Sequence, residues 1–98
     1  MIYHVTTKEA WKKDEQSNSY CPGAFLTEGF IHACHLSQLE GVLQRYFTGH
    51  PDPLLLHIDE SKLTSKVKEE LSTGNELFPH IYGKINKDAI VRTEPLRH

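Results

Sequence analysis

The apolar run Leu54-Leu55-Leu56, continued by Ile58, constrains the fold of this chain more than any other stretch. A short run without polar alternation is typical of a strand that is buried on both faces. It is far too short to span a bilayer as a helix, and we expect no membrane association. The sequence therefore predicts a central strand over 54–58, with other elements covering both of its faces.

The rest of the chain predicts an α+β domain around that strand. With 98 residues the chain corresponds to a single domain, residues 1–98. Segments 65–71 fit either a helix or a strand. Further strands are expected over these ranges: 2–5, 29–34, 78–85 and 89–93. The sum is two helices with five or six short strands.

Two capping patterns locate the helices. Thr6 and Glu9 fit a capping box that opens a first helix. Ser37 and Glu40 fit a second one, and apolar residues at helical spacing follow it as far as Phe47. The stretch 17–23 contains Ser, Asn, Pro and Gly and predicts a loop.

Charge and cysteine content exclude several classes of function. The formal net charge is −2, so no basic field holds nucleic acid and we expect no such partner. The strand-like start shows no signal-peptide pattern, which predicts a cytoplasmic location. Cys21 and Cys34 form no CxxC pair and are expected to be free thiols. The sequence does not define an oligomeric state.

The hexapeptide Phe78-Pro79-His80-Ile81-Tyr82-Gly83 carries the clearest site signal. Side chains two apart on a strand share a face, so His80 and Tyr82 should point the same way, with Ile81 opposed to them. Gly83 permits a turn or a close approach of another segment. The segment fits one wall of a binding site, although a strand end with a hydrogen-bonded His and Tyr explains it equally well.

Three parts of the chain together resemble one known family. They are Ile2-Tyr3-His4, then Glu28-Gly29-Phe30-Ile31-His32 with Gln38 after it, and Glu76 to Gly83. This combination is similar to the domain of unknown function 952 family and covers nearly the whole chain. The resemblance implies a fold like that of the ADP-ribosyltransferases: a small split mixed β-sheet with two helices, built around a nicotinamide-dinucleotide cleft.

The same resemblance implies a nucleotide-like ligand, with NAD, ADP-ribose or a related nucleotide as the candidates. NAD is also the candidate cofactor, and the sequence indicates no other cofactor. Glu70 is the nearest counterpart of the catalytic glutamate in the related superfamily, and carboxylates of this kind stabilise charged sugar transition states. The catalytic candidates are Glu70 and His80, and the ligand-binding candidates are His4, Thr6, Phe30, His32 and Tyr82.

Two alternatives remain beside an enzyme of NAD or ADP-ribose. One is a non-catalytic interaction module on the same fold, favoured by Val5 standing where the superfamily has Gly after the first-strand His. The other is a metal site formed by His32, Cys34 and His35 with His80. Structural zinc sites usually pair their ligands at two places in the sequence. Only one such cluster occurs, so we expect no metal.

Overall fold

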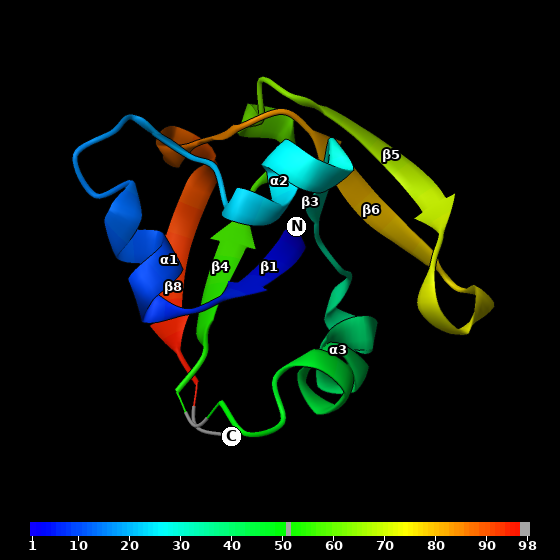
Figure 1. Cartoon of the computed structure of the whole chain (residues 1–98). Coiled ribbons are helices and arrows are strands. Elements are labelled where there is room, and N and C mark those ends of the chain that lie inside the picture. The colour runs from blue at the N-terminus through cyan, green and yellow to red at the C-terminus, as the bar shows by residue number, and fades with distance from the viewer. Residues whose placement is uncertain (51, 97–98) are drawn as a thin grey trace.

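The computed structural model describes residues 1–50 and 52–96 as a small α+β domain (Figure 1). Its strands are β1 Ile2–Thr6, β2 Ser19–Tyr20, β3 Ile31–His32, β4 Leu54–Ile58, β5 Lys66–Leu71, β6 Leu77–Tyr82, β7 Ile85–Asn86 and β8 Ile90–Pro95. Its α-helices are α1 Lys8–Lys13, α2 Gly23–Glu28 and α3 Leu39–Tyr46. Short 3-10 turns are η1 Leu36–Gln38, η2 Glu60–Lys62, η3 Thr73–Asn75 and η4 Lys87–Ala89.

The strands form three sheets, ordered β1-β4-β8, β3-β6-β5 and β2-β7. Every strand pair within them is antiparallel. The split of the sheet agrees with the expectation, but the expected mixed sheet was wrong. Parallel neighbours need long crossover connections. Among the described strands, only β5 and β6 are joined as a hairpin; the other paired strands are distant in the sequence, yet they also run antiparallel.

The apolar run forms the central strand β4, as predicted. It lies between β1 and β8, with Leu54 opposite Thr6 on one side and Pro95 on the other. Leu55 and Leu56 point to opposite faces and are 3% and 0% exposed. Both faces of β4 are therefore covered, which explains why the run lacks alternation.

The helices differ from the expectation at their starts. Thr6 pairs with Leu54 inside β1, so it is not available as a cap. Thr7 caps α1 instead, and its hydroxyl oxygen accepts a hydrogen bond from the amide of Ala10 at 3.1 Å. The helix α2 was not predicted; it is short and ends at Gly29, which adopts the left-handed conformation with φ 81°.

The helix α3 lies where the apolar spacing placed it, but it starts differently. Ser37 does not cap it, because Ser37 lies within the preceding turn η1. The Gln38 side chain closes that turn by accepting a hydrogen bond from the backbone amide of His35 at 2.9 Å. Two consecutive helical segments thus replace the single capping box of the sequence.

Segment 65–71 is a strand, β5, and its partner β6 is shorter than expected. The predicted strand over 78–85 is interrupted at Gly83, after which β7 begins in another sheet. A Cβ atom at Gly83 would collide with the Ser65 side chain. The glycine therefore serves close approach of two segments, one of the two roles expected for it.

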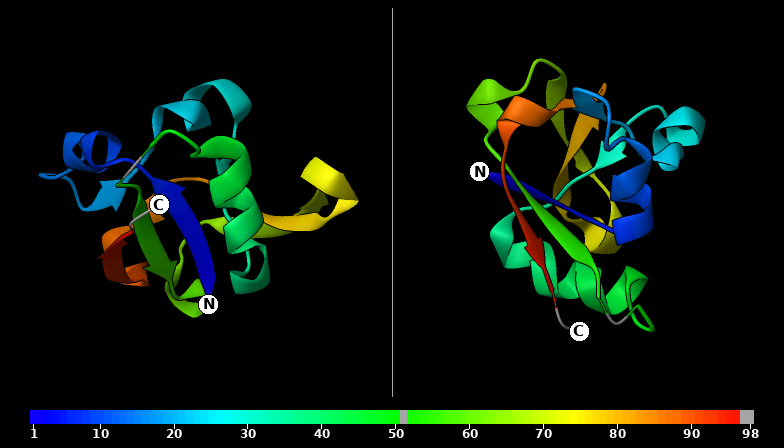
Figure 2. Two further views of the ribbon diagram at one scale, coloured as in Figure 1. Left: turned by 90° about the horizontal axis from the view of Figure 1, so that it is seen from below. Right: turned by 90° about the vertical axis from the view of Figure 1, so that its left-hand side faces the viewer.

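A bridge between Tyr3 and Cys34 joins the two three-stranded sheets. Their amides and carbonyls pair at 2.7 and 2.8 Å. The hairpin of β5 and β6 extends away from the β1-β4-β8 sheet, and its tip projects beyond the rest of the fold (Figure 2). Core side chains from both sheets meet around Leu56, Ile58 and Ile81, which are 0% exposed. Within the described residues no helix has the length and apolar character that crossing a membrane requires.

Candidate functional site

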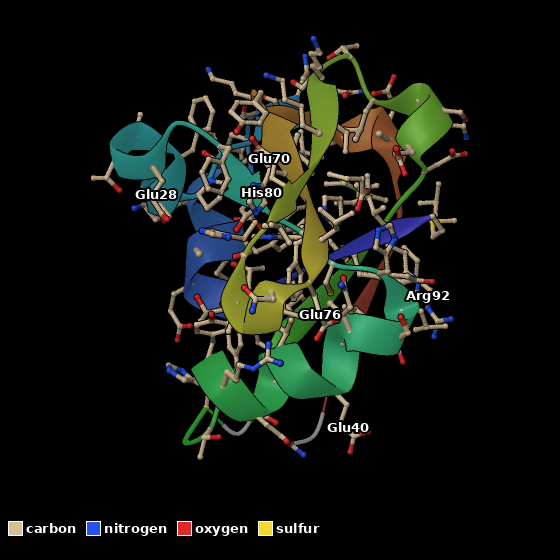
Figure 3. The ribbon with its side chains drawn as sticks, turned by 90° about the vertical axis from the view of Figure 1, so that its right-hand side faces the viewer. Glu28, Glu40, Glu70, Glu76, His80 and Arg92 are labelled. Carbon is tan, nitrogen blue, oxygen red and sulfur yellow. The ribbon has the colours of Figure 1, made fainter. Side chains whose placement is uncertain are left out.

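Glu70, His80 and Tyr82 form a hydrogen-bonded group on the β5–β6 hairpin. Figure 3 labels Glu70 and His80 on the two strands. The Nδ1 atom of His80 lies 2.9 Å from the Glu70 carboxylate, and the Tyr82 hydroxyl donates to the same oxygen. Since an ionised carboxylate only accepts, Nδ1 must carry the proton. The alternation of β6 places both side chains on one face, as the hexapeptide predicted.

The hydrogen bonds keep this carboxylate ionised. They lower the pKa of Glu70, with the Tyr82 hydroxyl as the largest cause and His80 as the second. The same contact raises the pKa of Tyr82, because the phenol donates its proton to a negative group. At neutral pH the group thus consists of a carboxylate with two donors directed at it.

Phe30 and His32 cover the ring of His80. The Phe30 ring stacks on it with centroids 4.1 Å apart and an interplanar angle of 20°, and it also leans on Tyr82 at 5.6 Å. His32 lies directly opposite His80 across β3 and β6, with ring centroids 5.4 Å apart. The Nε2 atom of His80 is buried and has no hydrogen-bond partner among the described residues.

His4 belongs to a second, deeper polar group. Its Nδ1 donates to the backbone carbonyl of His32 at 2.5 Å. Its Nε2 lies 3.4 Å from the hydroxyl of Tyr20, which is also 2.7 Å from the hydroxyl of Thr6. These side chains are almost inaccessible, at 8% for His4, 6% for Thr6 and 0% for Tyr20.

Burial keeps the His4 imidazole neutral. Loss of hydration lowers its pKa from 6.5 to about 4, a decrease that the hydrogen bond to the His32 carbonyl only partly offsets. The positive charge available on the His32 side chain acts in the same direction as burial. His4 is therefore a fixed neutral donor and acceptor at physiological pH.

A cavity of about 500 Å³ lies where the two three-stranded sheets meet α3. Its walls are largely apolar, with a few polar groups among them. Residues from β1, β3, β6, α2, α3 and the η3 region line it: Tyr3, His4, Val5, Glu28, His32, Ala33, Cys34, Val42, Tyr46, Phe47, Ser72, Thr73 and Phe78. The exposed pair of His32 and Glu28, 2.9 Å apart, belongs to this lining.

His32 connects the two polar groups. Its backbone binds His4, its ring contacts Phe30 and His80, and it lines the cavity. Four of the seven residues expected at the site do not line the cavity and are linked to it through the ring of His32: Glu70, His80, Tyr82 and Phe30. His4 and His32 line it, and Thr6 stands behind His4. His4 and His80 belong to different sheets, and His32 contacts both of them, His4 through its carbonyl and His80 through its ring.

Tyr20 was not identified from the sequence. It sits in the two-residue strand β2 and pairs with Ile85 of β7, a contact 65 positions away that no local pattern indicates. Its ring packs on Trp11 at 5.3 Å and on His4 at 5.6 Å. The only signal available was an aromatic residue in a loop-like segment.

The residues of the alternative metal site diverge. The His35 ring is directed at Glu69, 2.9 Å away, and Cys34 is 2% exposed in the bridge to β1. No group of three or more His, Cys, Asp or Glu side chains placed to hold a metal ion occurs in residues 1–50 and 52–96. Burial raises the pKa of the Cys34 thiol to about 11, which removes the thiolate that a metal or nucleophilic role needs.

Comparisons with known proteins place the fold but no activity. The crystal structure of protein CC0527 from Caulobacter crescentus is similar, with a TM-score of 0.87 and 25% identity over 97% of this chain and 84% of that chain. Its solution structure gives 0.82 and 25% over 98% and 84%. No curated protein matches the chain. A family model described as "Protein of unknown function (DUF952)" matches residues 5–93.

Proposed function

The chain thus belongs to the DUF952 family of proteins of unknown function, and we propose that it binds a nucleotide-like small molecule in the cavity between its two three-stranded sheets. NAD and ADP-ribose are the ligands to test first. One observation carries the proposal: a cavity of about 500 Å³ with apolar walls and a few convergent polar groups. Small-molecule sites usually have this size range and this character.

The chemistry of the lining favours the nicotinamide–ribose end of such a ligand. Aromatic side chains such as Tyr3, Phe47 and Phe78 suit a flat ring. The lining contains the carboxylate of Glu28 and no Lys or Arg among the described residues. A carboxylate complements the positive nicotinamide ring of NAD. The pyrophosphate of NAD or ADP-ribose finds no cation among the described residues of this lining and would lie outside it.

The expected site residues take distinct roles in this proposal. His4 and His32 border the ligand, and Thr6 acts through Tyr20 to hold His4 in place. Phe30 and Tyr82 offer aromatic surface beside the cavity. For catalysis, His80 supplies the reacting group and Glu70 acts through its hydrogen bond to His80. The likeness to the ADP-ribosyltransferase fold is part of the proposal, supported by the split sheets that border the cavity.

A thermal-shift titration with NAD and with ADP-ribose tests binding. A ligand at 100 times its dissociation constant adds about 2.7 kcal/mol to the free energy of unfolding, which raises the melting temperature by roughly 10–20 °C. His32→Gln should weaken binding about tenfold, the amount expected for the loss of one hydrogen bond. Absence of any shift with either ligand at millimolar concentration refutes the proposal.

The chain offers a matched control for His32. His35 forms an exposed pair with Glu69 at the same distance of 2.9 Å as His32 with Glu28, but neither partner lines the cavity. His35→Gln should therefore leave binding unchanged. Chromatographic detection of nicotinamide released from NAD distinguishes an enzyme from a non-catalytic binding module on the same fold.

A further inference from the structure

The unpartnered nitrogen of His80 separates it from the other histidines of the fold. Four His–Glu pairs occur among the described residues, each 2.9 Å apart. His32, His35 and His57 bind their glutamates through Nε2. His80 alone uses Nδ1, so its Nε2 is left as the free end of the ring.

That free end is buried, which makes it costly. The His80 side chain is 6% exposed, and Nε2 itself is inaccessible and without a partner among the described residues. A buried polar atom without a hydrogen bond costs about 1–3 kcal/mol. Native structures contain few such atoms, and each one needs an explanation. A donor that arrives with a ligand is the explanation that this position favours.

The surroundings determine which kind of donor fits. Glu70 holds the proton on Nδ1, so in the neutral imidazole Nε2 presents a lone pair and can only accept. His32 and Phe78, which line the cavity, lie on the same sheet face as His80, so the cavity ends beside this ring. Phe30 covers the ring face and follows Gly29, and it is only partly buried. Because Nε2 is inaccessible in the free protein, a ligand hydroxyl reaches it only when a neighbouring side chain, such as the partly buried Phe30, moves.

We propose that Nε2 of His80 accepts the hydrogen bond, and in a reaction the proton, of a ribose-type hydroxyl on the bound ligand. The O–H bond breaks, its electron pair stays on the oxygen, and a new N–H bond forms at Nε2. The Glu70 carboxylate balances the resulting imidazolium charge. Glu70 and Tyr82 are positioning residues, since they act through His80. The inference rests on the proposed function for the identity of the hydroxyl donor.

Proton-detected ¹⁵N spectra of the histidine rings test the assignment in the free protein. We expect the Nδ1–H form at His80 and the Nε2–H form at His57, which binds Glu94 through Nε2 and serves as the internal control. Addition of NAD or ADP-ribose should shift the Nε2 signal of His80 and leave that of His57 in place. A proton on Nε2 of His80 in the free protein overturns the inference, whatever binds.

A pair of variants tests the positioning role. Glu70→Gln keeps the side-chain volume but removes the charge, so it should release the fixed ring form of His80 and weaken nucleotide binding about tenfold. Glu94→Gln removes the same charge from the His57 pair and should change neither. A thermal shift with NAD while His80 stays unperturbed leaves the proposed function standing and overturns this inference. If neither NAD nor ADP-ribose produces a thermal shift or a change at His80, the proposed function and this inference are both refuted.

Discussion

Lowering the pH should remove a large part of the stability of this fold through one residue, His4. In the unfolded chain the imidazole takes up a proton below about pH 6.5. In the folded protein burial holds its pKa at about 4. Between these values the unfolded state binds more protons, so the free energy of unfolding falls as the pH falls. The stability that depends on neutral His4 is fully present above pH 6.5 and lost by pH 4.

The size of this effect follows from the same two values. One pH unit of difference corresponds to about 1.4 kcal/mol, so the change from pH 6.5 to pH 4 is about 3 kcal/mol. Small domains unfold with about 5–15 kcal/mol in total. Protonation of His4 should thus remove a substantial share, because the charged ring would sit beside His32 and the buried Tyr20 without water.

Urea denaturation at several pH values measures this directly. Trp11 is the only tryptophan and packs on Tyr20 beside His4, so its fluorescence reports on this region. Carboxylates with lowered pKa, such as Asp59, also lose stabilisation in acid. The comparison is therefore made between the wild type and His4→Gln. The difference between their free energies of unfolding should change by about 3 kcal/mol from pH 7 to pH 4.

Parallel pH profiles for the two proteins would refute the reasoning. His50→Gln supplies the matched control, because His50 is exposed and its removal should leave the wild-type profile unchanged. Should His4→Gln not fold, direct NMR titration of His4 in the wild type decides the same question. Protonation of His4 near pH 6.5 in the folded state contradicts the burial argument.

Two further predictions concern packing and thiol reactivity. Gly83→Ala should lower the free energy of unfolding by about 1–3 kcal/mol, since its Cβ collides with Ser65. Gly23→Ala is the control and should change it little, because a Cβ there meets nothing within 4 Å. Equal urea midpoints for the two variants would contradict this prediction. Cys34, with a pKa of about 11 and 2% exposure, should resist iodoacetamide at pH 8 while the less buried Cys21 reacts; mass spectrometry of the labelled protein checks this, and equal labelling refutes it.

Local patterns in the sequence predicted the elements whose signal lies within a few residues. The spacing of apolar residues located α3, and the unbroken run identified β4 as a strand buried on both faces. The alternation in Phe78 to Tyr82 placed His80 and Tyr82 on one face. Each of these follows from backbone periodicity alone.

Contacts between residues distant in the sequence explain the elements that were predicted wrongly or not predicted. Thr6 has good capping chemistry, but β1 uses its backbone in pairing with Leu54, and Thr7 caps the helix. Helix α2 has no apolar periodicity and no side-chain hydrogen bond at its N-cap, so no local pattern predicted it. Tyr20 joined the site through a strand pair with Ile85, which no short-range pattern encodes.

The sequence by itself determined which residue types face the same way on each strand, because side-chain alternation depends only on the local backbone. It therefore identified His80 and Tyr82 as candidates, whereas His32 became one through the family resemblance. Only the tertiary structure decided that Glu70 binds Nδ1 of His80 and leaves Nε2 unpartnered, and that His4 lies buried against the His32 carbonyl. These contacts join strands from two sheets, and their distances and burial depend on packing across the whole domain.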